Sequence, residues 1–218
     1  MFTVAIPTMW QAETFEEELI SVCSSYFVND LIIINNDYKK TPNWKILNYY
    51  KIMIVSPPRN LIVNPSWNLG VRLAKNNNIC LLNDDLTFDI SIFEFMSNHL
   101  DKNLCGLRME NIDPPIKLSI AEYRCLGFGC MMFLRKDTYD FIPSTLRLFH
   151  GDDYLFRMNK IKGNEVYYID GCFNNQVWGV TSKQGVEVNS RKLFDEIGEE
   201  QYELERLINE KSSFLHAK

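Results

Sequence analysis

The chain has 218 residues, which is enough for one α/β domain with a sizeable core and short for two. Its net charge of −5 argues against an overall affinity for nucleic acid or anionic membranes, because such binding needs clustered Lys and Arg. No apolar run reaches the roughly 18 residues of a membrane span. The first residues lack the basic leader of a signal peptide, and Pro7 ends their apolar run.

Six cysteines are spread along the chain without a Cys-x-x-Cys pair: Cys23, Cys80, Cys105, Cys125, Cys130 and Cys172. They mostly lie in apolar, strand-like sequence, which is typical of reduced, buried side chains rather than of a zinc site. We therefore expect a cytoplasmic protein whose cysteines are reduced.

The first half of the chain predicts strands that alternate with helices. Strands are expected at residues 2–6, 30–35, 51–55 and 79–82, and helices at residues 12–27 and 65–75. Short, continuously apolar strands are typical of a parallel sheet that is buried on both faces. Thr14 and Asn64 are the expected N-caps of the two helices, with Pro65 at the first helical position of the second.

Three polar clusters follow the expected strands directly. In sheets of this kind, ligands bind beyond the carboxyl ends of the strands. The rule predicts one rim that brings together Pro7-Thr8, Asn35-Asn36-Asp37 and Asn83-Asp84-Asp85.

The second half of the chain is less regular. Helices are expected at residues 90–100 and 152–162, and strands at residues 104–109, 129–134 and 166–169. Residues 191–211 predict a charged amphipathic helix packed on the outside. The whole pattern favours a single α/β domain with a mostly parallel central sheet flanked by helices.

Asp84 and Asp85 form the first candidate site. Two carboxylates at a strand end need solvent, a counter-ion or a metal, because like charges so close raise each other's pKa. A Mg²⁺ or Mn²⁺ ion that is also bound by a diphosphate would meet this need. The alternative is an acidic turn that only ends a strand.

The sequence around this pair resembles the family-two glycosyltransferases, which have the GT-A fold and use nucleotide sugars. In that family an Asn-x-Gly helix, here Asn68-Leu69-Gly70, leads into a strand and an Asp-x-Asp motif, here Asn83-Asp84-Asp85. The resemblance implies that Asp85 is the metal ligand and that Asp84 lies beside the sugar diphosphate. Asn83 replaces the first aspartate, so its contact with ribose, with metal or with neither stays open.

The resemblance extends to further residues that would hold the donor. It implies that Pro7, Thr8 and Asn68 help to bind the nucleotide and that Asn36 and Asp37 hold the nucleoside, although Asn36-Asp37 is also a typical turn. Gly129, in Gly127-Phe128-Gly129, matches the family's glycine-rich turn near donor sugar and acceptor. It is equally compatible with a bend before a core strand.

Asp152 and Asp153 form the second candidate site, in His150-Gly151-Asp152-Asp153. The segment resembles the family's Glu-Asp motif at a helix start, which implies that Asp153 is the general base and that Asp152 takes the preceding acidic place. A carboxylate within hydrogen-bond reach can take the proton of an attacking hydroxyl. The alternative is a pair of acids that stabilises a helix N-terminus.

Histidines and tryptophans are weaker candidates. His150 and His216 could supply a third metal ligand, although a lone histidine is more often structural. Trp67 and Trp178 could stack on a sugar or base, although core packing is the commoner use of tryptophan.

The sequence therefore predicts a hexosyl- or pentosyltransferase that moves a sugar from a UDP-sugar to an acceptor hydroxyl, with inversion and with Mn²⁺ or Mg²⁺. Residues 1–89 would form the nucleotide-sugar half, 90–185 the acceptor and catalytic half, and 186–218 a helical extension. One alternative is a sugar nucleotidyltransferase, but residues 8–13 lack the glycine-rich loop that it needs. Another is a non-catalytic sugar- or nucleotide-binding module.

The acceptor is expected to be a glycan or a hydroxymethylated base in phage DNA. Richness in Asn, Lys, Ile and Tyr is typical of AT-rich genomes, including those of many bacteriophages. The acidic net charge argues mildly against a DNA acceptor.

Overall fold

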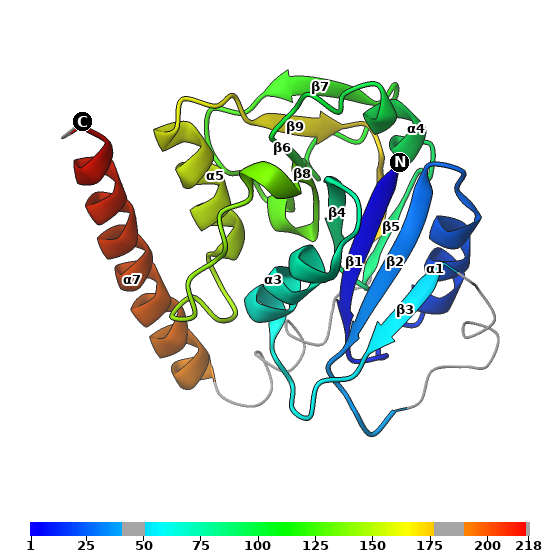
Figure 1. Ribbon diagram of the computed structural model, residues 1–218, viewed down its shortest axis with the longest axis horizontal. Coiled ribbons are helices and arrows are strands. Elements are labelled where there is room, and N and C mark those ends of the chain that lie inside the picture. Colours follow the sequence, from blue (N-terminus) through cyan, green and yellow to red (C-terminus); the bar gives the residue numbers. More distant parts are fainter. Residues whose placement is uncertain (41–50, 177–189, 217–218) are drawn as a thin grey trace.

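The computed structural model describes residues 1–40, 51–176 and 190–216 of the chain. An eight-stranded sheet runs through it in the order β3-β2-β1-β4-β8-β6-β9-β7, and a separate two-stranded sheet pairs β10 with β5 (Figure 1). The strands are β1 (Phe2–Thr8), β2 (Val28–Asn35), β3 (Ile52–Val55), β4 (Asn78–Leu82), β5 (Leu86–Phe88), β6 (Leu104–Leu107), β7 (Lys117–Ile120), β8 (Met131–Arg135), β9 (Tyr167–Asp170) and β10 (Phe173–Gln176).

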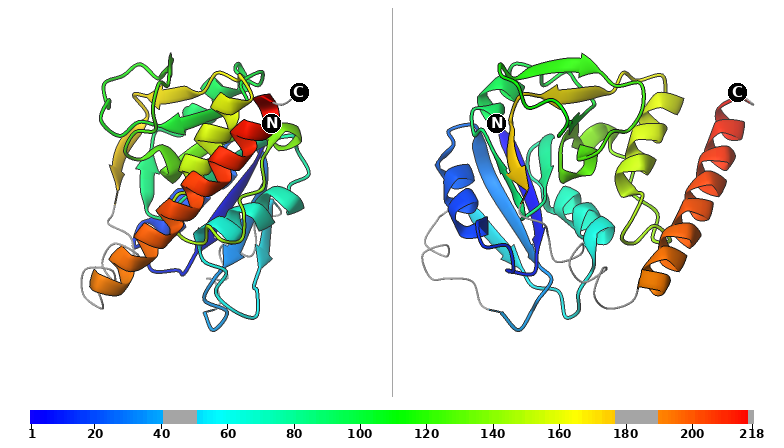
Figure 2. Two further views of the ribbon diagram at one scale, coloured as in Figure 1. Left: turned by 90° about the vertical axis from the view of Figure 1, so that its left-hand side faces the viewer. Right: turned by 180° about the vertical axis from the view of Figure 1, so that it is seen from behind.

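Helices cover the large sheet. The α-helices are α1 (Phe15–Ser24), α3 (Val63–Leu73), α4 (Ile92–Ser97), α5 (Gly151–Ile161) and α7 (Ser190–His216), and the 3₁₀ helices are η1 (Phe128–Cys130) and η2 (Lys136–Thr138). Figure 2 shows α7 lying along the outside of the molecule, next to α5. No helix within the described ranges is long and apolar enough to cross a bilayer.

The sheet has a parallel half and a mixed half. β3, β2, β1 and β4 run parallel, as the continuously apolar strands predict. β8 is antiparallel to both β4 and β6, and β7 is antiparallel to β9. The carboxyl ends of β1, β2 and β4 therefore meet on one side, as expected.

Each face of the sheet carries its own core. Alternate residues of a strand point to opposite faces. Accordingly, Val4 and Ile6 of β1 pack with α1 and α4, whereas Ala5 packs with the cluster that contains Trp67 of α3. This arrangement buries β1 completely and explains why it reads as an unbroken apolar run.

The helix starts agree with the expectation only in part. Thr14 is the N-cap residue of α1, as predicted, but its backbone is helical and its side chain makes no capping hydrogen bond. α3 begins at Val63, so Asn64 lies inside the helix and is not its cap; Ile62 precedes the helix with φ 68° and ψ −172°. The Asn64 amide instead donates to the carbonyls of Leu146 and Phe149, at 3.2 and 2.9 Å.

The second half also departs from the expectation in places. The strand predicted from residue 129 begins at Met131, because residues 128–130 form a 3₁₀ turn. The strand predicted to residue 109 ends at Leu107, and β5, β7 and β10 were not predicted. All six cysteines are free, and all but the half-buried Cys130 are buried, as expected.

Candidate active site

The first of two neighbouring clefts lies at the carboxyl ends of β1, β2 and β4. It has a volume of about 140 Å³ and is lined by Pro7, Thr8, Met9, Asn36, Asn60, Ile62, Val63, Asn83, Asp84, Asp85 and Leu148. The parallel half of the sheet thus brings together residues from three distant parts of the chain. Pro7, Thr8, Asn36 and the Asn83–Asp85 turn meet here as the sequence predicts.

Asp84 is held at the base of this cleft by β1. The Thr8 hydroxyl donates to Asp84 Oδ2 at 2.6 Å. Burial raises the pKa of Asp84 to about 6, and the charge of Asp85 adds to this rise while the Thr8 hydrogen bond opposes it. Two adjacent acids, of which Asp84 is half-buried and Asp85 buried, are thus costly to ionise together, and a cation would relieve that cost.

The donor set fits a hard divalent cation that a phosphate ligand completes. Asp85 is buried, at 7% exposure, directly after Asp84. Within the described part of the chain, no group of three or more His, Cys, Asp or Glu side chains could hold a metal by itself. Mg²⁺ commonly binds to one or two carboxylates together with substrate phosphates and water, and that is the chemistry these two residues offer.

The side chains of Asn36 and Asp37, which follow β2, make contacts in different places. The Asn36 amide donates to Ser66 Oγ at 3.1 Å, and its Oδ1 accepts from the Leu61 amide at 3.0 Å, which links β2 to α3. Asp37 does not line the cleft; its Oδ2 lies 4.0 Å from Lys40 Nζ.

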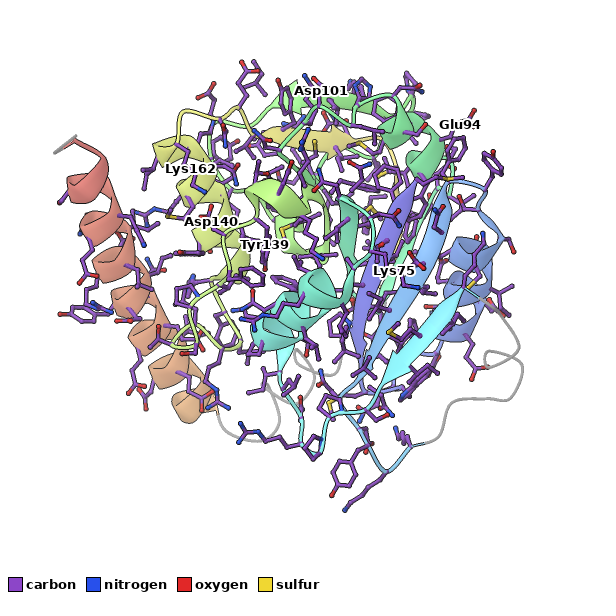
Figure 3. All side chains as sticks on the ribbon, in the orientation of Figure 1. Lys75, Glu94, Asp101, Tyr139, Asp140 and Lys162 are labelled. Carbon is purple, nitrogen blue, oxygen red and sulfur yellow. The ribbon has the colours of Figure 1, made fainter. Side chains whose placement is uncertain are left out.

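Asn68 lies outside both clefts. Its amide donates to the Ile142 carbonyl at 2.8 Å, and its Oδ1 accepts from the Tyr139 hydroxyl at 2.9 Å and from the Ile142 amide at 3.0 Å. Figure 3 labels Tyr139 and the neighbouring Asp140, whose carboxylate pairs with Lys162 at 2.6 Å. Asn68 therefore fastens residues 139–142 to α3.

The second cleft lies beside the first and has a volume of about 730 Å³, within the range of typical ligand pockets. It is lined by Val63, Asn64, Trp67, Asn83, Met109, Arg124, Leu126, Gly127, Gly129, Cys130, Leu148, Phe149, His150, Gly151, Asp152, Asp153, Phe173 and Ile197. The two clefts share Val63, Asn83 and Leu148 as walls. A ligand in one cleft would therefore lie next to a ligand in the other.

Asp152 and Asp153 open α5 and share Arg124. Arg124 Nε donates to Asp153 Oδ1 at 2.8 Å, and a second guanidinium nitrogen donates to Asp152 Oδ2 at 3.3 Å. His150 Nδ1 lies 3.1 Å from Asp153 Oδ2. Sequence analysis did not single out Arg124, since it belongs to no motif and reaches these acids only through the fold.

The pKa values of the two carboxyl groups are shifted in opposite directions. Burial raises the pKa of Asp152, and the opposing charge of Arg124 does not cancel it. Burial would also raise the pKa of Asp153, but its hydrogen bond with His150 and the charge of Arg124 outweigh burial and lower it. Asp153 therefore stays ionised at neutral pH.

Two glycines let the elements of the second cleft approach closely. A Cβ on Gly129 would lie 2.9 Å from the Asp152 carboxyl carbon, and one on Gly151 would lie 2.1 Å from Asn64 Oδ1. Gly129 thus makes room for Asp152, and both residues line the second cleft. Gly151 lets α5 start against α3.

The remaining aromatic and histidine candidates divide. Trp67 lines the second cleft but is 4% exposed and belongs to the core. His150 faces Asp153 in the second cleft and does not line the first, where Asp84 and Asp85 lie. Trp178 and the side chain of His216 lie outside the described residues.

Comparison with known proteins identifies the fold. No family model matches the chain, and no curated protein does. Comparison with solved structures shows that the chain has the fold of a GT-A-like glycosyltransferase. Similar structures include several of TarS from S. aureus.

The complex of TarS with UDP-GlcNAc has a TM-score of 0.64 and 12% identity, over 95% of this chain and 65% of that one. The complex with UDP has a TM-score of 0.55 and 12% identity, over 77% of this chain and 59% of that one. A third TarS structure has a TM-score of 0.55 and 11% identity, and this chain covers 60% of it. The chain thus spans about 60% of the TarS chains.

Proposed function

We propose that the protein transfers a sugar from a nucleotide-diphosphate donor to an acceptor hydroxyl with inversion. The observation that carries the proposal is the pair of adjoining clefts, each with two carboxylates, that share Val63, Asn83 and Leu148. Transfer needs a donor and an acceptor side by side, because proximity and orientation supply much of the rate. The fold, shared with a structure of TarS in complex with UDP-GlcNAc, supports a UDP-sugar as the donor.

The first cleft is the proposed donor site. Asp85, with Asp84 beside it, would hold Mn²⁺ or Mg²⁺, which would stabilise the charge of the departing diphosphate. Pro7, Thr8, Asn36 and Asn83 line the same cleft and would contact the nucleotide sugar. Asp37 and Asn68 lie outside the cleft lining, and we assign them no direct contact with the donor.

The second cleft is the proposed acceptor site. Asp153 is the carboxylate that drives removal of the proton from the acceptor hydroxyl, and Arg124, which also bonds Asp152, holds it in place. A single displacement by a hydroxyl activated in this cleft, on a sugar held in the other, inverts the anomeric carbon. Apolar side chains such as Met109, Leu126 and Phe173 line much of the cleft and suit the face of a sugar ring or a base.

A donor screen tests this proposal. Purified protein is incubated with a panel of nucleotide sugars and Mn²⁺, with and without glycan and hydroxymethylated-DNA acceptors, and nucleoside diphosphate is measured. We expect release with at least one UDP-sugar, increased by one acceptor class and abolished by a chelator. Binding of a nucleotide sugar without release of nucleoside diphosphate, whichever acceptor is present, would instead indicate a non-catalytic module. Release of pyrophosphate from a nucleoside triphosphate would indicate a nucleotidyltransferase.

A further inference from the structure

His150 departs from two local preferences at once. Its backbone is left-handed, with φ 57° and ψ 12°, at the residue before α5. An N-cap residue usually bonds an orphan amide with a Ser, Thr, Asp or Asn side chain, but the His150 side chain makes no such bond. Departures of this kind are concentrated at functional sites.

The carboxylate of Asp153 has both oxygens engaged. Oδ1 accepts from Arg124 Nε at 2.8 Å, and Oδ2 lies 3.1 Å from His150 Nδ1. An ionised carboxylate only accepts hydrogen bonds, so Nδ1 of His150 carries the proton that it donates to Asp153. In the neutral imidazole, Nε2 then has an available lone pair.

His150 is one of the residues that line the second cleft, and its Nε2 is buried without a hydrogen-bond partner among the described residues. Asn64 Oδ1 and Trp67 Nε1 share this property, but of the three atoms only the imidazole nitrogen is a base near neutral pH. Buried polar atoms without partners are rare, because leaving one unpaired destabilises the folded state. A role in proton transfer would explain why the fold tolerates this cost.

We infer that His150 and Asp153 form a dyad in which His150 Nε2 takes the proton of the acceptor hydroxyl. The inference rests on the proposed function and names the atom that acts as base. The hydroxyl oxygen forms the bond to the anomeric carbon as its proton passes to Nε2. The bond from that carbon to the diphosphate breaks, and its electron pair leaves with the nucleoside diphosphate. Asp153 keeps its negative charge and stabilises the imidazolium.

The charges around His150 support this role. Asp152 and Asp153 face it from α5 and Glu200 from α7, while Arg124 pairs with the two aspartates. The hydrogen bond with Asp153 raises the pKa of His150 above its usual 6.5, against the opposing effect of burial. A base whose pKa lies near the working pH is more effective than a carboxylate whose pKa is lowered.

The pH profile separates the two bases. If Nε2 is the base, the maximal rate at saturating donor falls as the pH drops through the raised pKa of His150, because the imidazolium cannot accept a proton. If Asp153 accepts the proton directly, its lowered pKa keeps the rate constant down to about pH 4. A flat profile between pH 8 and pH 5 would overturn the inference.

His150→Asn separates catalysis from positioning. Asparagine tolerates the left-handed backbone and can donate to Asp153 from the place of Nδ1, but it has no basic nitrogen. We expect transfer to fall about a hundredfold or more, with the affinity for donor unchanged. Near-normal transfer would show that His150 only positions Asp153. His99→Asn changes a histidine that lines neither cleft; it is the matched control and should keep both the rate and the pH profile.

A spectroscopic measurement does not depend on turnover. In ¹⁵N NMR, His150 should titrate above pH 6.5 with the proton of its neutral form on Nδ1, and Asp153→Asn should lower that pKa. A His150 pKa that is insensitive to Asp153→Asn would refute the dyad. If the spectra show the dyad but the parent protein transfers no sugar, it is the proposed function that fails.

Discussion

Asp152 and Asp153 share one cation, Arg124, and this sharing determines how the second cleft is charged. The two carboxylates are mostly buried and adjacent, and Arg124 contacts both of them. The hydrogen bond with His150 and the charge of Arg124 lower the pKa of Asp153, and its carboxylate therefore stabilises the folded state at neutral pH. Because that pKa is depressed on folding, the stabilisation is present above the unfolded pKa near 3.9 and is lost as the pH falls through the lower folded value.

Arg124→Gln should therefore destabilise the protein in a pH-dependent way. We expect the free energy of unfolding at pH 7 to fall by about 1–2 kcal/mol, the scale of a partly exposed hydrogen bond between charged groups. The difference from the parent should shrink below pH 4, where protonation removes the charge that Arg124 balances. Urea denaturation at several pH values measures it, and a difference that grows as the pH falls would contradict the assignment.

At the residue scale, the sequence predicts the two carboxylate pairs but not their neighbours. Asp84-Asp85 follows a strand and Asp152-Asp153 opens a helix, so their positions follow from local structure. Arg124 lies 28 residues from Asp152 in the chain, and only the fold brings them together. Asn68 belongs to the Asn-x-Gly motif, yet its side chain makes three hydrogen bonds with residues 139–142. No local sequence pattern predicts these contacts.

Among the elements, α3 sets the wall between the two clefts. Its Gly70 faces β1, where an added Cβ would lie only 2.5 Å from the Cβ of Ala5. The same helix carries Ser66, which bonds Asn36 in the first cleft, and Trp67, which lines the second cleft. Close contact between α3 and β1 therefore fixes both clefts at once.

Gly70→Ala should push α3 away from β1. We expect a loss of about 1–3 kcal/mol in the free energy of unfolding, the usual effect of overpacking, together with weaker donor binding. Gly198→Ala in α7 is the matched control, because a Cβ there meets nothing within 4 Å. That variant should gain about 0.5–1 kcal/mol from better helix propensity. Equal stability of the two variants in urea denaturation would show that the α3–β1 contact is looser than described.

The elements that sequence predicts are those with a strong local pattern. Short apolar runs indicate β1, β2 and β4, and the helical period of apolar residues indicates the long, amphipathic α7. β5 and β10 are short and pair with each other across more than 80 residues, and β7 is an edge strand without a buried residue. Their pairing depends on tertiary contacts that a local window does not contain.

At the scale of the whole molecule, the sheet joins a parallel half, whose strand ends carry the proposed donor cleft, to a mixed half. β8 makes the junction, since it pairs antiparallel with β4 on one side and β6 on the other. On the outside, α7 contacts the segment that precedes α5: the Glu200 carboxylate accepts hydrogen bonds from the amides of Leu148 and Phe149, at 3.1 and 2.9 Å. Leu148 belongs to both clefts, so the C-terminal helix supports their common wall.

The central claim is that the cleft at the carboxyl ends of β1, β2 and β4 binds a nucleotide diphosphate together with a divalent cation. Calorimetric titration of UDP in the presence and absence of Mn²⁺ tests it most directly, with the parent protein compared with Asp85→Ala. Asp101→Ala, which removes a 71%-exposed carboxylate, is the matched control. We expect Mn²⁺ to strengthen UDP binding in the parent and in Asp101→Ala, and this increase to vanish in Asp85→Ala while its melting temperature shows an intact fold. Binding of UDP with Mn²⁺ that is unchanged in Asp85→Ala would contradict the account.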